Sequence, residues 1–200
     1  MRYVFELLFA FLAILLLRLL YQLYRRIFKY ADRTIDDVAP LLREVKLEQL
    51  EELVDDQQES LLRLNLSDRQ FRQAQKKRVR RMLEYLGCMT HNTGIVWEWA
   101  RYERKRGWIA EDNDHQQLSE EVIHTCIQVV GGARAIQLQL HLWLIKNAIL
   151  PKMPELSLAS LRKIETFDLL ESYDYLRGAV LALSQRIYGD AYLEQLLQAL

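Results

Sequence analysis

The sequence is poor in the residues that make loops, tight turns and disulfide bonds. Its 200 residues include only 7 glycines, 3 prolines and 2 cysteines. The two cysteines, Cys88 and Cys126, cannot form a disulfide framework, and they suit a reducing compartment. Leucine, glutamine, glutamate and arginine, which all favour helices, are abundant instead. We therefore expect an all-α protein.

An excess of one charge and the motifs of common enzymes are also missing. The 27 basic and 27 acidic residues give a formal net charge of zero, so no nucleic-acid partner is expected. The sequence has no glycine-rich phosphate loop and no G-x-S-x-G nucleophile elbow. These absences weaken the case for an enzyme without excluding one, and no cofactor is expected.

The longest apolar segment runs from Tyr3 to Tyr24 and carries only two charges, on Glu6 and Arg18. A helix that crosses a bilayer needs about 20 mostly apolar residues, so this segment is expected to be a single transmembrane helix. A cleaved signal peptide is not expected, because no small-residue cleavage site follows the segment before Arg25. An apolar helix buried in a protein core is the alternative. The residues assigned to the anchor are Phe5, Leu8, Phe11, Leu15, Arg18 and Tyr21.

Basic residues cluster on the carboxyl-terminal side of this segment. Arg25, Arg26 and Lys29 follow it, whereas only Arg2 precedes it. Lysine and arginine are enriched on the cytosolic side of membrane helices, so the rest of the chain is expected in the cytosol. The three basic residues are expected to contact anionic lipid headgroups. The sequence thus predicts a membrane anchor over residues 1–33 and a cytosolic all-helical domain over residues 34–200.

Hydrophobic spacing predicts a bundle of about five helices after the anchor. The first helix is expected to open at Pro40, where a missing N–H costs nothing, and it has an acidic face and an apolar stripe at coiled-coil spacing. The stripe consists of Leu47, Leu50, Val54, Leu61 and Leu64, with Gln57 among them. A capping box from Ser67 to Gln70 predicts that a second, basic helix starts near Asp68, and Gly87 is expected to end it. The two helices are expected to form an antiparallel hairpin with complementary charges.

Three more helices and one loop are expected in the second half of the chain. A third helix is predicted from about Thr93 to Arg106, a polar loop over 110–117, and a long fourth helix from about Leu118 to Leu150. Residues 136–145 alternate as in a strand, but a strand without a partner is unstable, so a helix is expected there. A fifth helix is predicted from Ser157 to Gly189, followed by a short last helix.

Two sets of side chains are candidates for contacts with other molecules. The basic residues from Arg69 to Arg81 could bind phosphates or acidic lipid, although pairing with the acidic first helix is the simpler expectation. On the predicted third helix, Trp97, Arg101 and Arg104 lie away from the expected core side. Tryptophan and arginine are favoured at protein interfaces, so these three residues are the predicted interaction site. The alternative is that Trp97 lies flat on neighbouring side chains.

Two pairs of residues have the spacing of metal ligands. Glu121 and His124 form an E-x-x-H pair, of which a di-iron bundle needs two, together with two further glutamates. Cys88 and His91, three residues apart, could share a zinc ion. Neither pair completes a site, so these four residues are kept as candidates while no metal is expected.

The anchor, the leucine stripe and the Trp97 site together predict a membrane-anchored scaffold, adaptor or accessory subunit that acts through protein–protein contacts. Its expected partners are membrane lipid and other membrane or cytosolic proteins, including further copies of itself. Two alternatives stay open. One is a metal-dependent, membrane-bound helical-bundle enzyme. The other is a peripheral domain that senses anionic lipid through the basic faces of Arg69 to Arg81 and Arg101 to Arg106.

Overall fold

Every secondary-structure element that the structure describes is a helix. The computed structural model describes residues 34–149 and 165–200, and no strand occurs within them. The expectation of an all-α protein is therefore confirmed. Residues 1–33, with the predicted anchor and its basic flank, and Ser157, the predicted start of a helix, lie outside the described residues. Within the described ranges, no helix is long and apolar enough to cross a membrane.

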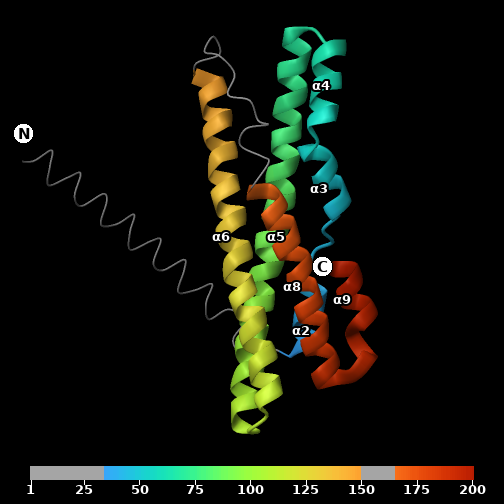
Figure 1. Cartoon of the computed structure of the whole chain (residues 1–200), viewed down its shortest axis with the longest axis vertical. Coiled ribbons are helices and arrows are strands. Elements are labelled where there is room, and N and C mark those ends of the chain that lie inside the picture. Colours follow the sequence, from blue (N-terminus) through green and yellow to red (C-terminus); the bar gives the residue numbers. More distant parts are fainter. Residues whose placement is uncertain (1–33, 150–164) are drawn as a thin grey trace, which may run out of the picture.

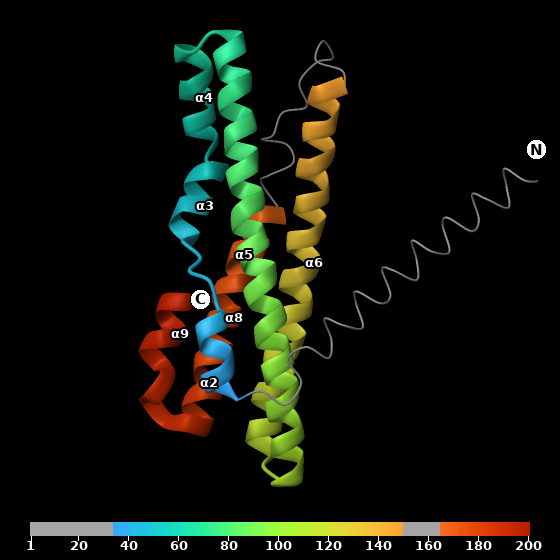
Figure 2. The same ribbon diagram turned by 180° about the vertical axis from the view of Figure 1, so that it is seen from behind.

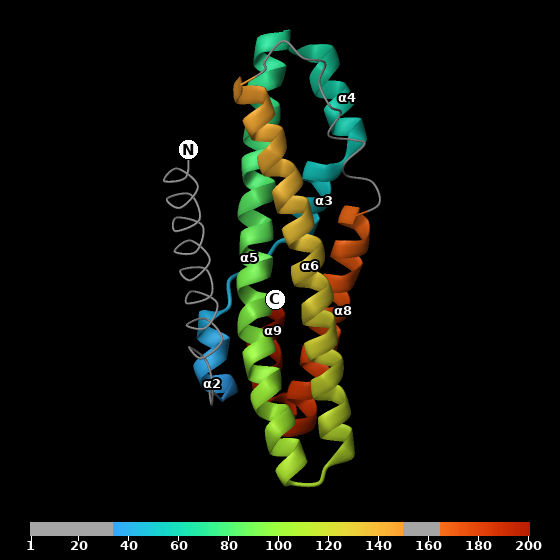
Figure 3. The same cartoon turned by 90° about the vertical axis from the view of Figure 1, so that its left-hand side faces the viewer.

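Two long antiparallel helices, α5 (Asp68–Ile109) and α6 (Asn113–Ile149), form the frame of the molecule (Figure 1). With 42 residues, α5 is about 60 Å long at a rise of about 1.5 Å per residue. A third helix, α8 (Glu165–Tyr188), packs along α6 (Figure 3). Their facing sides supply most of the hydrophobic core.

Short helices cover the side of α5 that faces away from α6 (Figure 2). Two of them, α3 and α4, lie alongside the first part of α5, and α2 and α9 lie on the same side near its later part. In chain order they are α2 (Ile35–Val38), the 3₁₀ helix η1 (Ala39–Leu41), α3 (Leu47–Val54), α4 (Asp56–Asn65), the 3₁₀ helix η2 (Gly189–Tyr192) and α9 (Leu193–Ala199).

The helix α5 is one helix where two were predicted. It starts after the capping box of Ser67 and Gln70, as expected. The predicted end at Gly87 and the predicted separate helix from Thr93 are wrong, because α5 continues through both positions. A glycine inside a helix costs about 1 kcal/mol, and burial of the apolar face outweighs that cost. The buried side chains around Gly87 are Met82, Leu86, Met89, Val96 and Trp99.

The first predicted helix does not open at Pro40, which lies in the 3₁₀ helix η1, and the segment after it forms two helices, α3 and α4. The helix is interrupted at Asp55. Its Oδ1 accepts a 2.9 Å hydrogen bond from the backbone N–H of Gln57 and so caps the start of α4. Aspartate favours this role over a helix interior. As a result Leu50 is fully buried, whereas Leu64 is 83% exposed. The expected continuous coiled-coil stripe is therefore wrong, although α4 and α5 do form the predicted helical hairpin.

The polar segment before α6 belongs mostly to the helix. The predicted loop over 110–117 is wrong, because α6 already begins at Asn113. Its first turn is capped by Asp112, whose Oδ1 accepts a 3.1 Å hydrogen bond from the N–H of His115. Residues 136–145 are helical, as predicted. The helix α8 ends where predicted, before Gly189, whose φ of 64° favours glycine.

Asn92 joins distant parts of the chain inside the core. Its Oδ1 accepts a 2.8 Å hydrogen bond from the N–H of Arg43, and its Nδ2 donates to the Arg43 carbonyl at 2.6 Å. The same Nδ2 lies 3.2 Å from the Tyr173 hydroxyl and 3.3 Å from the Ala199 carbonyl oxygen. One side chain in the middle of α5 is therefore hydrogen-bonded to the segment before α3, to α8 and to the end of α9.

Candidate functional site

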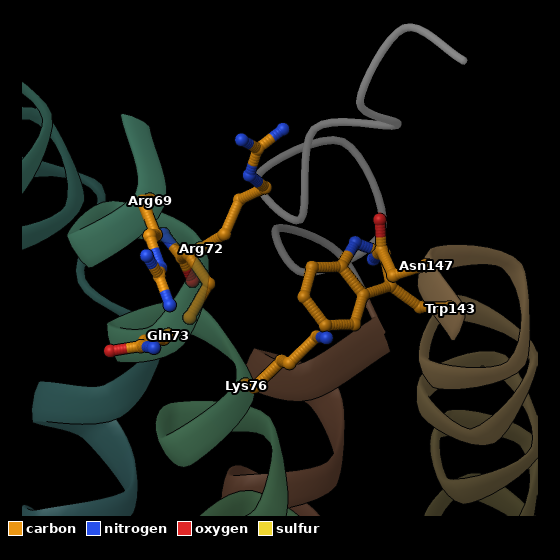
Figure 4. A pocket seen from close by; sticks show the side chains of 7 residues that line it. Arg69, Arg72, Gln73, Lys76, Trp143 and Asn147 are labelled. Atoms are coloured by element: carbon orange, nitrogen blue, oxygen red, sulfur yellow. The ribbon is translucent and has the colours of Figure 1, made fainter. Parts of the chain in front are cut away.

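A basic pocket lies between the first turns of α5 and the last turns of α6 (Figure 4). Its volume is about 220 Å³. The basic side chains come from α5, and Trp143 and Asn147 face them from α6. The lining residues are Arg69, Arg72, Gln73, Gln75, Lys76, Trp143 and Asn147. The fold thus brings a basic segment and an aromatic residue from distant parts of the sequence to one opening.

Three positive charges at this pocket have no carboxylate partner among the residues that the structure describes. Arg69, Arg72 and Lys76 are three and four residues apart, so they share one face of α5. Both arginines are exposed, and Lys76 is half-buried. Within residues 34–149 and 165–200, none of the three lies within ion-pair distance of a carboxylate. The described lining of the pocket is therefore positively charged.

The described lining of the pocket is basic on one side and aromatic on the other. Trp143 is buried and forms an apolar wall, toward which the Lys76 side chain points (Figure 4). Among the described lining residues, the groups that can bind a ligand are two arginines, one lysine, two glutamines and one asparagine. Arginine and lysine supply charge-assisted hydrogen bonds to carboxylates or phosphates.

The predicted interaction residues lie further along α5, outside this pocket. Trp97 is half-buried against the core, and its ring centroid lies 5.6 Å from the Arg101 guanidinium carbon, a cation–π geometry. Burial raises the pKa of the neighbouring Glu98 carboxyl, and the charge of Arg101 partly offsets that rise. Arg104 is exposed. The two arginines are open to a partner, while Trp97 is shared with the core.

The candidate metal ligands do not converge. The Glu121 carboxylate accepts a hydrogen bond from the Tyr175 hydroxyl, and His124 is exposed on the surface of α6. His91 Nε2 lies 3.1 Å from the carbonyl oxygen of Leu41, which gives the imidazole a backbone partner beside the half-buried Cys88. The described part of the chain contains no group of three histidine, cysteine or acidic residues able to hold a metal ion.

A buried polar cluster joins α5, α6 and α8 at the other end of the bundle. The Glu103 side chain is fully buried, and its Oε1 accepts a 2.7 Å hydrogen bond from the Tyr188 hydroxyl. Its Oε2 lies 3.3 Å from Arg106 Nη1 and 3.5 Å from His115 Nε2. Burial, together with the hydrogen bond to Glu103 and the charge of that carboxylate, raises the pKa of Tyr188 to about 12.

Sequence analysis missed this cluster, although one signal for it was present. Glu103 stands four residues after Trp99 and seven after Val96, so it occupies a core position of the apolar face of α5. A carboxylate at such a position needs polar partners, because an unpaired buried charge is strongly unfavourable. Those partners could not be named from spacing, since Tyr188 is 85 residues away.

An apolar stripe lies exposed on α6. The side chains of Leu138, Leu142 and Ile145 are separated by one helical turn each, and Ile127 lies on the same face three turns earlier. All four are more than half exposed. Exposed apolar patches of this kind mark contact surfaces, so the stripe is a further candidate for contact with another molecule.

Comparison of the chain with protein-family models, curated proteins and solved structures gave no match. Function is therefore argued from the residues themselves.

Proposed function

We propose that this protein is a single-pass, membrane-anchored scaffold or adaptor whose helical domain binds an acidic segment of another protein in the basic pocket. The observation that carries the proposal is the group of three cationic side chains, Arg69, Arg72 and Lys76, which line the same pocket as Trp143 and have no carboxylate partner among the described residues. The anchor is residues 1–33, and the domain faces the cytosol.

The chemistry of the pocket selects an acidic protein segment. Arg69 and Arg72 can each form two parallel hydrogen bonds with a carboxylate. Arginine and tryptophan are also the residues most often found at the energetic centre of protein interfaces. Figure 4 shows the Arg69 and Arg72 side chains pointing in different directions rather than at one point. A segment with several carboxylates fits this spread better than one small anion.

The position of the pocket suits an adaptor. The described chain begins at Thr34, and α2 lies beside the later part of α5 (Figure 1). The pocket lies at the opposite end of α5, and 35 residues of helix separate Arg69 from Arg104, a distance of about 50 Å. If Tyr3–Tyr24 spans the bilayer, α5 carries the pocket away from the membrane. Arg101 and Arg104 remain predicted contacts for a second part of the partner.

The first experiment is native mass measurement of the full-length protein extracted from its own membrane in mild detergent. A photo-reactive amino acid at Gln73, which lines the pocket, would identify the bound segment. We expect a complex heavier than the lone chain and a cross-link to an acidic peptide of one companion. A particle containing only this chain, with no cross-link at Gln73, would contradict the proposal.

A matched pair of charge reversals then tests the pocket itself. In Arg69→Glu/Arg72→Glu, affinity for the purified companion is expected to fall at least about tenfold, because two charge-assisted contacts become repulsive. Arg80→Glu/Arg81→Glu makes the same charge change at exposed positions of α5 outside the pocket. This control is expected to bind normally. If both variants lost the same affinity for the companion, binding would depend on the overall charge of the protein and not on the pocket, and the proposal would be contradicted.

A further inference from the structure

Two large apolar side chains are exposed together at the turn between α5 and α6. Trp108 is 73% exposed and Ile109 is 74% exposed, and they are the last two residues of α5. A short turn over 110–112 follows before α6 begins. Single exposed apolar residues are common on protein surfaces. An adjacent tryptophan and isoleucine at the end of α5 form one apolar patch instead, and such patches mark contact surfaces.

The described chain begins near this same end of the molecule. The Tyr192 hydroxyl donates a hydrogen bond to the Asp36 carboxylate, next to the start of α2. The Tyr192 ring packs against Tyr188, with centroids 5.5 Å apart, and Tyr188 in turn bonds to Glu103. Figure 2 shows α2 beside the later part of α5, toward the α5–α6 turn. Thr34 therefore leaves the domain at the end that carries Trp108.

The linker to the apolar segment is short. Nine residues, 25–33, separate Tyr24 from Thr34. Even fully extended, nine residues span only about 30 Å. If the bilayer holds Tyr3–Tyr24, this linker keeps the α5–α6 turn close to the bilayer surface. The short linker therefore gives the turn a high effective concentration at the bilayer.

The charges around the turn are nearly balanced by ion pairs. Arg106 lies 3.3 Å from Glu103. Arg186 lies 3.3 Å from Asp112 and 3.8 Å from Asp114. These pairs bring the positive and negative charges of the turn close to cancellation. An acidic partner of the kind proposed for the pocket finds little attraction here.

The remaining charges flank the apolar pair without dominating it. Arg104 and Lys105 are exposed on one side, and Glu111 is exposed on the other. Tryptophan is favoured at membrane–water interfaces, where its apolar ring and polar N–H both find suitable surroundings. A nearly neutral turn that exposes tryptophan and isoleucine therefore matches the interfacial zone of a bilayer.

We propose that the α5–α6 turn is a second membrane contact, in which Trp108 and Ile109 insert into the interfacial zone of the bilayer that holds the anchor. This inference rests on the membrane anchor of the proposed function. The two contacts together fix the orientation of α5 relative to the bilayer, which a single point of attachment does not. Because the turn is nearly neutral, its insertion depends on apolar contact and responds little to salt.

The test uses the full chain reconstituted into phosphatidylcholine nanodiscs, with and without bromine atoms on the acyl chains. Bromine quenches tryptophan fluorescence only at short range, and Trp97, Trp99 and Trp143 are half-buried or buried. We expect brominated lipid to quench the wild-type protein. Trp108→Phe should lose most of that quenching, and raising the salt concentration should leave the wild-type quenching unchanged.

A matched pair of variants separates insertion from general surface effects. Ile109→Asp places a charge beside Trp108 and should abolish its quenching by brominated lipid. Leu64→Asp makes the same kind of change at a residue that is 83% exposed, on α4 near the other end of α5, and should leave the quenching intact. Both side chains are exposed, so neither change is expected to unfold the domain.

The outcomes distinguish the anchor from the turn. If the protein migrates with the discs but wild type and Trp108→Phe are quenched equally, the second contact is wrong and the anchor stands. If the protein does not enter the discs at all, the anchor and the second contact both fail. If Trp108 emission shifts with protein concentration and not with brominated lipid, the turn contacts another copy of the chain, and the bilayer proposal is overturned.

Discussion

The Tyr188 hydroxyl donates a 2.7 Å hydrogen bond to the fully buried carboxylate of Glu103. This bond joins the last turn of α8 to the later part of α5, between residues that are 85 positions apart. It also gives the carboxylate a second partner beside Arg106. The energetic importance of this end of the bundle can be measured directly.

Tyr188→Phe removes the hydroxyl and leaves Glu103 with fewer hydrogen-bond donors. We expect the free energy of unfolding to fall by about 1–2 kcal/mol, because a buried charged acceptor loses a partner. Urea unfolding followed by circular dichroism measures the change. Tyr175→Phe is the control, since Tyr175 bonds to Glu121 at an exposed position. Its effect should stay within about 0.5 kcal/mol.

Stability should fall at alkaline pH partly because of the same residue. The pKa of Tyr188 is raised from 10.0 to about 12, so the folded protein keeps this proton between those pH values while the unfolded chain releases it. The contribution of Tyr188 to the free energy of unfolding is therefore fully present below pH 10, and it is lost as pH rises from 10 toward 12. Burial raises the pKa of Tyr173 to about 12 as well, so Tyr188→Phe should reduce the slope without removing it. Identical slopes in the two proteins would contradict this prediction.

Asn92→Ala should be among the most damaging polar substitutions. It removes a fully buried amide and leaves the part-buried N–H and carbonyl of Arg43 without that partner, and we expect a loss of about 1–3 kcal/mol, the usual cost of an unmet hydrogen-bonding group that is shielded from water. Hydrogen exchange at the Arg43 amide should accelerate more than at other amides. Asn65→Ala removes an exposed amide whose hydrogen bond goes to the Leu61 carbonyl one turn earlier, and it should change stability little.

Two glycines of α5 should respond to alanine with opposite signs. A Cβ at Gly107 would lie 3.0 Å from His115 Cγ and 3.3 Å from the backbone nitrogen of Gln116. Gly107→Ala is therefore expected to cost about 1 kcal/mol or more through steric displacement. A Cβ at Gly87 would meet nothing within 4 Å, so Gly87→Ala should stabilise the protein by about 0.5–1 kcal/mol. Thermal unfolding of both variants tests the pair.

The two cysteines should react with thiol reagents at very different rates. Cys126 is buried, and burial raises the pKa of its thiol, so little of the reactive thiolate forms in the folded protein. Cys88 is half-buried and should react first. Cys126 should be modified only on unfolding, at a rate that rises with urea. Simultaneous modification of both thiols in the folded protein would contradict this burial.

Local signals predicted some ends of helices and missed others. The capping box at Ser67 and the stop before Gly189 are confirmed, because each depends on a few neighbouring residues. Gly87 also looks like a stop, yet α5 passes through it, since the buried face on either side decides the outcome. At Asp55 the reverse holds, because capping of α4 interrupts a stripe that hydrophobic spacing predicts to be continuous.

The pocket was predictable only in part. The basic run from Arg69 to Arg81 is evident in the sequence, but the members that share an opening with Trp143 depend on how α6 returns beside α5. Trp143 and Asn147 carried no local signal of this kind. The cluster around Glu103 shows the same limit, because its partners come from three helices.

The hydrogen bonds of Asn92 have a consequence for how quickly the protein reaches its final form. They link residues 49, 81 and 107 positions apart, whereas contacts inside helices are local. The chain loses conformational entropy when such long loops close, and the contacts that compensate for this loss form only afterwards. Proteins rich in distant contacts therefore fold more slowly. The long helices should therefore appear early in refolding, and Asn92 should find Arg43 and Ala199 in a later, slower step.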